Sequence, residues 1–291
     1  MNYLQALKSI NPNFQEIIQQ EVKSCNGETI GFHCYSIENH RTFAGGTHSS
    51  QETALRISVS ESFERSLLNT IKNDQKLRRD FLIEQHPSSS GFAAGFEMHS
   101  TSFRALCEGV ERWIWSKWID EQYILEEVDE KMLEANYSLL AKDFRANFDQ
   151  VKWYKKDLSL KISHKLFHLR CLIFLGINEE GIYPGSRVSS VNDNITEHPI
   201  IEAYRNFKNV QLFRKQAYDL HDIIQKRVLF FGQNKKIALN QIELCHKRNW
   251  PAPQIKLFKE LQFFNQSIFL SRCLIDDYLE WSVGSYDRFV Y

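Results

Sequence analysis

The chain has 291 residues, of which 43% are hydrophobic and 25% are charged, the composition of an ordinary folded soluble protein. Its 36 basic and 36 acidic residues cancel, so the formal net charge is zero. Nucleic-acid-binding proteins usually carry a basic excess that neutralises phosphates, so this balance argues against such a role.

Hydrophobic periodicity and turn residues predict a mixed order of helices and strands rather than a strict alternation. In chain order we expect a helix over 1–22, a strand over 27–37, a loop over 40–51, a helix over 52–73, loop signals over 86–100, a helix over 101–120, mixed helix and turn over 121–155, strands within 164–178 and 179–194, helices over 195–220, 220–247 and 251–265, and strands over 267–275 and 279–291. This order favours an α+β or irregular α/β fold with long helices packed on a sheet. We expect a single domain over residues 1–291, with residues 1–27 as an N-terminal helical extension.

Nothing in the sequence predicts a membrane or a secretory location. No stretch approaches the roughly 20 apolar residues that span a bilayer, and the N-terminus is polar within its first dozen residues. We therefore expect a cytoplasmic protein.

The six cysteines are scattered along the chain and form no CxxC pair. A zinc site or a disulfide framework needs closer spacing, so we expect reduced, mostly buried thiols and no metal–thiolate chemistry. The cysteines are Cys25, Cys34, Cys107, Cys171, Cys245 and Cys273.

The most informative feature is a short repeat of the form E-x-x-E-R within two predicted helices. Its members are Glu61, Glu64 and Arg65 in the first helix, and Glu108, Glu111 and Arg112 in the second. Because positions three and four apart share one helix face, each copy projects two carboxylates and a guanidinium to one side.

Two such helices side by side would bring four carboxylates and two guanidiniums together. Carboxylates repel at short range, and a magnesium ion, which prefers hard oxygen ligands, would relieve that repulsion. Arginines could then hold phosphate oxygens bidentately. The alternative, an ordinary exposed helix ion pair at each copy, stays open. No GxxxxGK[ST] or GxGxxG loop is present, so a nucleotide would bind by another architecture.

The segments around the repeat resemble the YcaO family, in the family's order, over residues 28–291. AGGTHSSQETALRISVSESFER resembles its glycine loop and first ExxER helix, and SSSGFAAGFEMHSTSFRALCEGVERW resembles its S-N-G-x-A-A-G-N loop and second ExxER helix. RVSSVNDNITEHPIIEAYRNFKNV resembles the third motif, and the residues after 266 resemble the closing strands.

The resemblance implies a domain whose carboxylates hold ATP and magnesium. Known members phosphorylate a peptide amide oxygen after a nucleophile adds to the carbonyl, and they form azolines, thioamides or amidines. Carried over to this sequence, the metal- and ATP-binding carboxylates are Glu61, Glu64, Glu108 and Glu111, and the motif arginines near the phosphates are Arg65 and Arg112.

The sequence departs from the family pattern at several of these motifs. Ile57 stands where the first motif has a serine, and Trp113 follows the second ExxER in place of an aspartate. The remaining departures are Phe96 for an asparagine, Ser100 for a further metal-binding glutamate, and Asn206 and Asn209 for the Glu and Gln of the third motif.

Two functions therefore remain open. One is an ATP- and magnesium-dependent enzyme, of the cyclodehydratase or thioamide-forming kind, that activates a peptide backbone amide. The other is a catalytically silent protein of the same fold that binds a peptide or a partner subunit. In either case no substrate-binding segment precedes residue 28, so we expect a partner protein to deliver the peptide. A homodimer is compatible with the resemblance.

Overall fold

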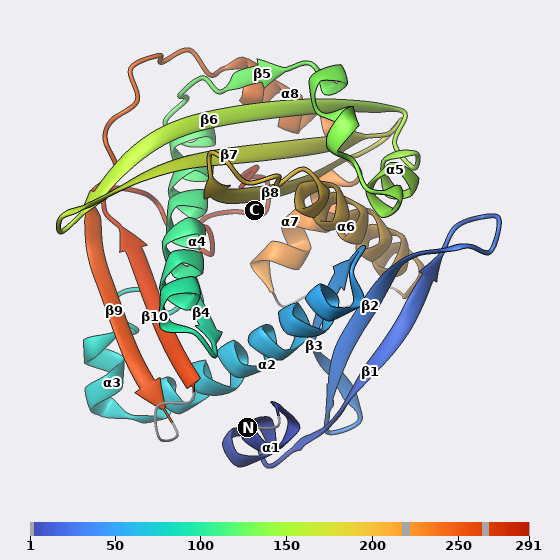
Figure 1. The fold of residues 1–291 in the computed structure, drawn as a ribbon. Coiled ribbons are helices and arrows are strands. Elements are labelled where there is room, and N and C mark those ends of the chain that lie inside the picture. The colour runs from blue at the N-terminus through green and yellow to red at the C-terminus, as the bar shows by residue number, and fades with distance from the viewer. Residues whose placement is uncertain (1–2, 217–221, 264–267, 291) are drawn as a thin grey trace. The chain divides into compact units, whose positions relative to one another are not determined.

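The computed structural model describes residues 3–216, 222–263 and 268–290. Helices and strands follow one another irregularly along the chain, which confirms the predicted α+β class (Figure 1). The chain forms two compact units, the first made of Met1–Gly109 and Lys256–Leu274, the second of Val110–Ile255 and Ile275–Tyr291. The single domain over residues 1–291 stays a prediction.

The first unit contains two three-stranded sheets, ordered β1-β2-β3 and β4-β10-β9. Helix α2 packs against β2, β3 and β4. The elements are α1 (Tyr3–Ile10), β1 (Phe14–Lys23), β2 (Thr29–Glu38), β3 (Arg41–His48), α2 (Gln51–Asn73), α3 (Gln75–Asp80), β4 (Phe92–Gly95), α4 (Met98–Ile119), whose residues after Gly109 belong to the second unit, β9 (Ile255–Phe263) and β10 (Ile268–Ile275).

The expected N-terminal helical extension is helical only at α1. Residues 14–23 form β1, which pairs antiparallel with β2 along its length. The connection contains Asn26 and Gly27, and Gly27 has φ +82, a backbone conformation that favours glycine in tight turns. The turn and the pairing with β2 outweigh the helical spacing of the apolar residues.

The loop expected over residues 40–51 is largely strand β3. Its glycines serve packing here, because a Cβ atom on Gly46 would lie 2.6 Å from the Cβ of Ile57 and 2.7 Å from the carbonyl oxygen of Ala54. Gly46 therefore allows α2 to lie close against β3. Helix α2 itself begins as predicted, with the Ser50 side chain accepting a hydrogen bond from the backbone N–H of Thr53.

The helix expected over residues 251–265 is strand β9. Ile255, Leu257, Leu261 and Phe263 share the two-residue period of a strand, which Phe258 and Lys259 interrupt. The strand pairs with β10 at the edge of its sheet. The short strand β4 likewise lies in the segment where loop signals dominate, and pairs with β10 on its other side.

The second unit is built on a four-stranded antiparallel sheet, ordered β5-β6-β7-β8, and α6 packs against β7 and β8. The elements after α4 are β5 (Glu126–Val128), two short 3-10 turns (Glu130–Met132 and Glu134–Asn136), α5 (Leu139–Arg145), β6 (Gln150–Ile162), β7 (Lys165–Ile177), β8 (Ile182–Ser190), α6 (Glu197–Gln216), α7 (Ile223–Phe231) and α8 (Lys235–Glu243). The end of the helix expected over 195–220 lies outside the described residues.

The strand expected over residues 279–291 is absent from the described residues 276–290. Arginine side chains donate hydrogen bonds to the backbone carbonyl oxygens that a neighbouring strand would otherwise bond. Arg227 donates to the carbonyl oxygens of Trp281, Val283 and Ser285, and Arg288 donates to those of Leu279, Glu280 and Val283. The segment is held as an irregular chain by these bonds.

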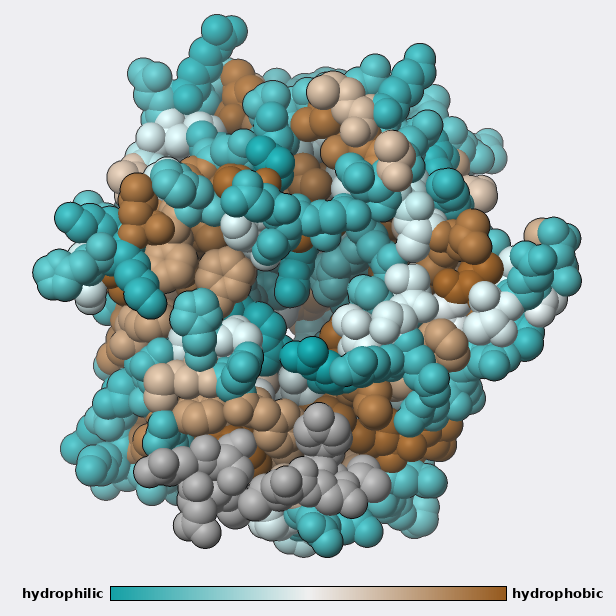
Figure 2. Space-filling view, viewed as in Figure 1, coloured by the Kyte–Doolittle hydropathy of each residue, from teal (hydrophilic) through white to brown (hydrophobic). Residues whose placement is uncertain are grey.

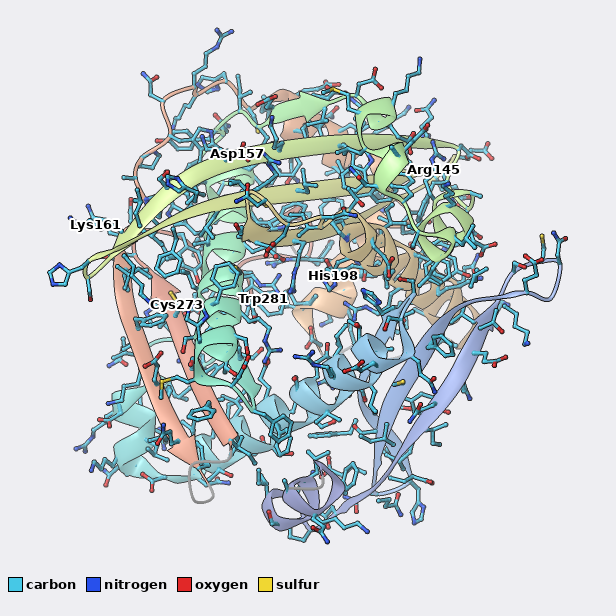
Figure 3. All side chains as sticks on the ribbon, in the orientation of Figure 1. Arg145, Asp157, Lys161, His198, Cys273 and Trp281 are labelled. Carbon is cyan, nitrogen blue, oxygen red and sulfur yellow. The ribbon has the colours of Figure 1, made fainter. Side chains whose placement is uncertain are left out.

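The surface gives no indication of a membrane span. The face in Figure 2 is mostly hydrophilic with scattered hydrophobic residues, and in the described residues no helix is long and apolar enough to cross a bilayer. All six cysteines are free thiols, and four of them, including Cys273 on β10 (Figure 3), are buried, as predicted.

Candidate functional site

The first copy of the repeat lies on α2 next to its buried face. That face carries Ser58, Ser62 and Phe63, so Glu61 and Glu64 project beside the packed side of the helix. The carboxylate of Glu61 accepts a hydrogen bond from the backbone N–H of Gly45 at 3.4 Å and lies 3.8 Å from the Arg65 guanidinium.

Three carboxylates of the first unit interact electrostatically. The pKa of Glu64 is raised well above its ordinary value, first by burial and then by the negative charges of Glu108 and Glu61. The positive charges of Arg104 and Arg65 oppose this shift. The Glu64 carboxyl on α2 is therefore within electrostatic range of Glu108 on α4. That the two copies of the repeat form one metal and phosphate site stays a prediction.

These three carboxylates fit a magnesium ion in donor chemistry, because they supply hard oxygen atoms and a concentration of negative charge. Their positions do not form a complete set of metal ligands. Across the part of the chain that the structure describes, no group of three or more His, Cys, Asp or Glu side chains is placed to hold a metal ion.

Glu111, the second glutamate of the second copy, has a different environment in the second unit. Its carboxylate accepts hydrogen bonds from the Ser186 hydroxyl at 2.8 Å and from the backbone N–H of Val188 at 3.1 Å. Burial raises the pKa of Glu111, Arg112 lowers it, and the charge of Glu202 raises it further. Glu111 thus caps the outer edge of β8.

Glu202 on α6 is a residue that the sequence interpretation missed. Its carboxylate accepts a 2.8 Å hydrogen bond from the backbone N–H of Ser186, the next outward-facing group of β8. The third-motif alignment pointed instead to Asn206, which is buried and donates to the carbonyl oxygen of Pro184 at 2.8 Å. Helical spacing points to Glu202, because it lies one helical turn before Asn206 on the same face of α6.

The two motif arginines have partners within their own units. Arg65 is exposed and donates to the backbone carbonyl of Phe43 on β3. The guanidinium of Arg112 lies 4.6 Å from the ring centroid of Trp281, a cation–π contact. Trp281 is labelled in Figure 3.

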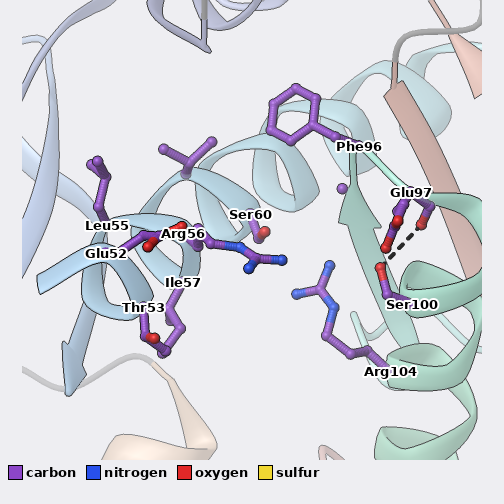
Figure 4. Close-up of a pocket in the computed structure, with 12 residues that line it drawn as sticks. Glu52, Thr53, Leu55, Arg56, Ile57, Ser60, Phe96, Glu97, Ser100 and Arg104 are labelled. Atoms are coloured by element: carbon purple, nitrogen blue, oxygen red, sulfur yellow. Dashed lines mark hydrogen bonds between the residues drawn. The ribbon is translucent and has the colours of Figure 1, made fainter. Parts of the chain in front are cut away.

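A pocket of about 400 Å³ opens in the first unit between α2 and the β4–α4 segment. Arg56 on α2 and Arg104 on α4 point toward one another across it (Figure 4). Phe96 and Ser100, two of the departures from the family pattern, both line it, and the Phe96 ring packs edge-on against Phe63. The full lining is Glu52, Thr53, Leu55, Arg56, Ile57, Val59, Ser60, Gly95, Phe96, Glu97, Ser100 and Arg104.

Comparison with solved structures shows two proteins of similar fold. One is the structure of YcaO from Methanopyrus kandleri bound with AMPPCP and Mg2+, at TM-score 0.55 and 11% identity, covering 100% of this chain and 94% of that chain. The other is a heterocyclase in complex with substrate and cofactor, at TM-score 0.55 and 10% identity, covering 98% of this chain and 53% of that chain.

The chain has a YcaO-like fold. This confirms the resemblance predicted from the two ExxER helices. No protein-family model matches the sequence, and no curated protein matches it. The YcaO-like fold is therefore established by three-dimensional similarity, at an identity of 10–11%.

Proposed function

We propose that this chain binds ATP with magnesium and uses it to activate a peptide backbone amide, in the manner of azoline- or thioamide-forming proteins. The observation that carries the proposal is the grouping of Glu61, Glu64 and Glu108 in the first unit, where the negative charges of Glu61 and Glu108 help to raise the pKa of Glu64. A YcaO neighbour bound with AMPPCP and Mg2+ supports the choice of cofactor. The peptide, and its delivery by a partner protein, belong to the same proposal.

Glu64 and Glu108 are the residues that would hold the metal, since they come from different helices and their charges repel without a cation. Glu61 would complete the set while its bond to Gly45 fixes it against β3. When bound, magnesium would neutralise the phosphate charge, and the nucleotide would supply the phosphoryl group for the amide oxygen.

The other three residues of the repeat have positioning roles in this proposal. Arg65 holds the backbone of β3 at Phe43, and Glu111 holds the edge of β8. Arg112 would position Trp281 through the cation–π contact between its guanidinium and the indole ring, within the second unit.

Calorimetric titration of ATP with magnesium tests the proposal on the wild-type chain and on Glu64→Gln. We expect the substitution to weaken binding at least ~10-fold, equivalent to ~1.4 kcal/mol, because the amide lacks the carboxylate charge. Glu16→Gln is the control, since Glu16 is an exposed carboxylate on β1 in the same unit. Binding that is equal in wild type and Glu64→Gln would contradict the proposal.

The competing function is a silent protein that binds a peptide or partner subunit. The observation in its favour is that no group of three metal-ligating side chains is in place among the described residues. If the wild-type chain binds no nucleotide with magnesium while its folding is intact, this second function is supported.

A further inference from the structure

We propose that the pocket between Arg56 and Arg104 binds a phosphate-bearing anion directly through its two guanidiniums, without a metal ion. This inference rests on the proposed function for the source of the anion, the phosphate chain of a nucleotide. It adds a site that the ExxER repeat does not include, because neither arginine belongs to the repeat.

The charges at the pocket favour an anion. Arg56 and Arg104 approach the same cavity from two helices, and their guanidiniums point toward one another (Figure 4). Two like charges directed into one cavity repel, and an anion between them converts the repulsion into attraction. Arg56 is exposed, and among the described residues it makes no hydrogen bond or ion pair; a guanidinium carries five N–H donors.

The two opposed guanidiniums favour a phosphate group as the anion. One guanidinium fork can pair with both oxygens of a carboxylate along a single edge. A phosphate group offers more acceptor oxygens, directed to several sides, and so suits two forks that face one another. The hydroxyl of Ser60, one helical turn after Arg56, lines the same pocket and adds a further donor.

Residues of the pocket precede the carboxylates of the repeat on both helices. Arg56, Ser60 and Glu64 follow one another at four-residue spacing along α2, and Arg104 precedes Glu108 by four residues on α4. Glu64 and Glu108 therefore each follow a pocket residue by about 6 Å along the helix axis. Arg104 links the two, because it lines the pocket and its charge also acts on Glu64.

Other groups around the pocket set the limits of the site. Arg104 also donates a hydrogen bond to the carbonyl oxygen of Ala94, and this bond fixes one side of its guanidinium group. Glu52 and Glu97 line the pocket as exposed carboxylates and oppose an anion. Leu55 and Phe96 give it an apolar side, which suits the uncharged part of a larger ligand.

The test is calorimetric titration of the full chain with inorganic pyrophosphate in EDTA. We expect binding by the wild type, and a loss of about tenfold or more in affinity in Arg56→Gln and in Arg104→Gln, the usual effect of removing a charged hydrogen-bond donor. Arg41→Gln is the control, because Arg41 is exposed on β3 and does not line the pocket. Arg56 is also exposed, so Arg56→Gln reports on binding even if Arg104→Gln disturbs folding.

Two further measurements test the effect of charge at the pocket and the chemical class of the anion. Glu52→Gln is expected to strengthen pyrophosphate binding, because it removes an opposing charge. Glutarate, a dicarboxylate, is expected to bind more weakly than pyrophosphate. Glutarate binding as tightly as pyrophosphate, absence of pyrophosphate binding in EDTA, or binding unchanged in both arginine variants would each overturn the inference.

The outcome is separable from that of the proposed function. If EDTA abolishes pyrophosphate binding while ATP with magnesium still depends on Glu64, the arginine site is wrong and the proposed function stands. If pyrophosphate binds in EDTA through the arginines while ATP binding is indifferent to Glu64→Gln, the arginine site stands and the proposed function fails.

Discussion

Glu64 and Glu111 are equivalent positions of the repeat, and burial raises the pKa of both, but their nearest partners differ. Around Glu64 are further carboxylates, so its charged form is disfavoured by both burial and repulsion. Around Glu111 are a hydroxyl and a backbone N–H that donate to it, so its charged form gains direct hydrogen bonds. The same residue type at the same spacing therefore lies among carboxylates in one unit and bonds a strand edge in the other.

The raised pKa of Glu64 predicts a pH-dependent stability difference for Glu64→Gln without magnesium. A carboxyl whose pKa is higher in the folded than in the unfolded state contributes stability at pH below its unfolded value, and loses it as pH rises toward the folded value. We therefore expect Glu64→Gln to be more stable than wild type at neutral pH, by about 1.4 kcal/mol for each pKa unit of difference. The gain should shrink as pH falls from the raised folded-state pKa toward about 4.5, the ordinary glutamate value, and vanish below it.

Urea unfolding of both proteins at a series of pH values measures this difference. Equal stability of wild type and Glu64→Gln at neutral pH would show that Glu64 is not destabilised by its neighbours.

Ser186 is the residue that joins the groups around β8. Its hydroxyl donates to Glu111 and accepts a 2.9 Å hydrogen bond from the Trp115 indole, and its N–H donates to Glu202. Ser186→Ala is expected to lower the free energy of unfolding by about 1–3 kcal/mol, because it leaves buried polar groups unpaired. Ser189→Ala is the control, since Ser189 is on the same strand but its hydroxyl bonds an exposed group, Asp193. Chemical denaturation measures the free energy of unfolding of both variants. If Ser186→Ala loses no more stability than Ser189→Ala, Ser186 does not hold the groups around β8 together.

At the scale of elements, close packing decides which segments become strands. Helix α2 approaches β3 at Gly46, where a side chain would meet Ile57 and Ala54. The buried serines of α2 are small as well, and Ser62 donates to Ser36 of β2 at 2.8 Å. Small residues on both surfaces therefore bring the ExxER helix close to the β1-β2-β3 sheet.

Gly46→Ala is expected to destabilise the protein by about 1–3 kcal/mol, because the added methyl group overlaps α2 and forces it away from β3. The adjacent Gly45→Ala is the matched control, since a Cβ there meets its nearest atoms only at 3.3–3.4 Å. Thermal unfolding of the two variants compares them. If both lose equal stability, strand conformation rather than helix packing explains the glycine.

At the scale of the whole molecule, ligand binding links the site to stability. A ligand that binds only the folded chain stabilises it, by about 2.7 kcal/mol at a concentration one hundred times its dissociation constant. We expect ATP with magnesium to raise the melting temperature of the wild type and of Glu16→Gln, and to raise that of Glu64→Gln much less. A thermal melt with and without the nucleotide measures this. An equal rise in all three proteins would place the nucleotide away from Glu64.

The amino-acid sequence by itself determined the helices that carry the repeat. The Ser50 cap, the apolar periodicity and the i, i+3 spacing of the glutamates are local properties, and α2 and α4 follow from them. The buried strand around 171–177 is equally local, as a continuous apolar run.

Only the tertiary structure decided which strands pair and which side chains interact. β1 and β9 are strands because β2 and β10 lie beside them, although their own sequences also permit a helix. Glu108 meets Glu64, whereas Glu111 meets Ser186 and Glu202, which are 75 and 91 residues further along the chain. Arg56 and Arg104 share a pocket for the same reason. Contacts between residues far apart in sequence depend on how the elements pack, and one sequence carries no local signal for that packing.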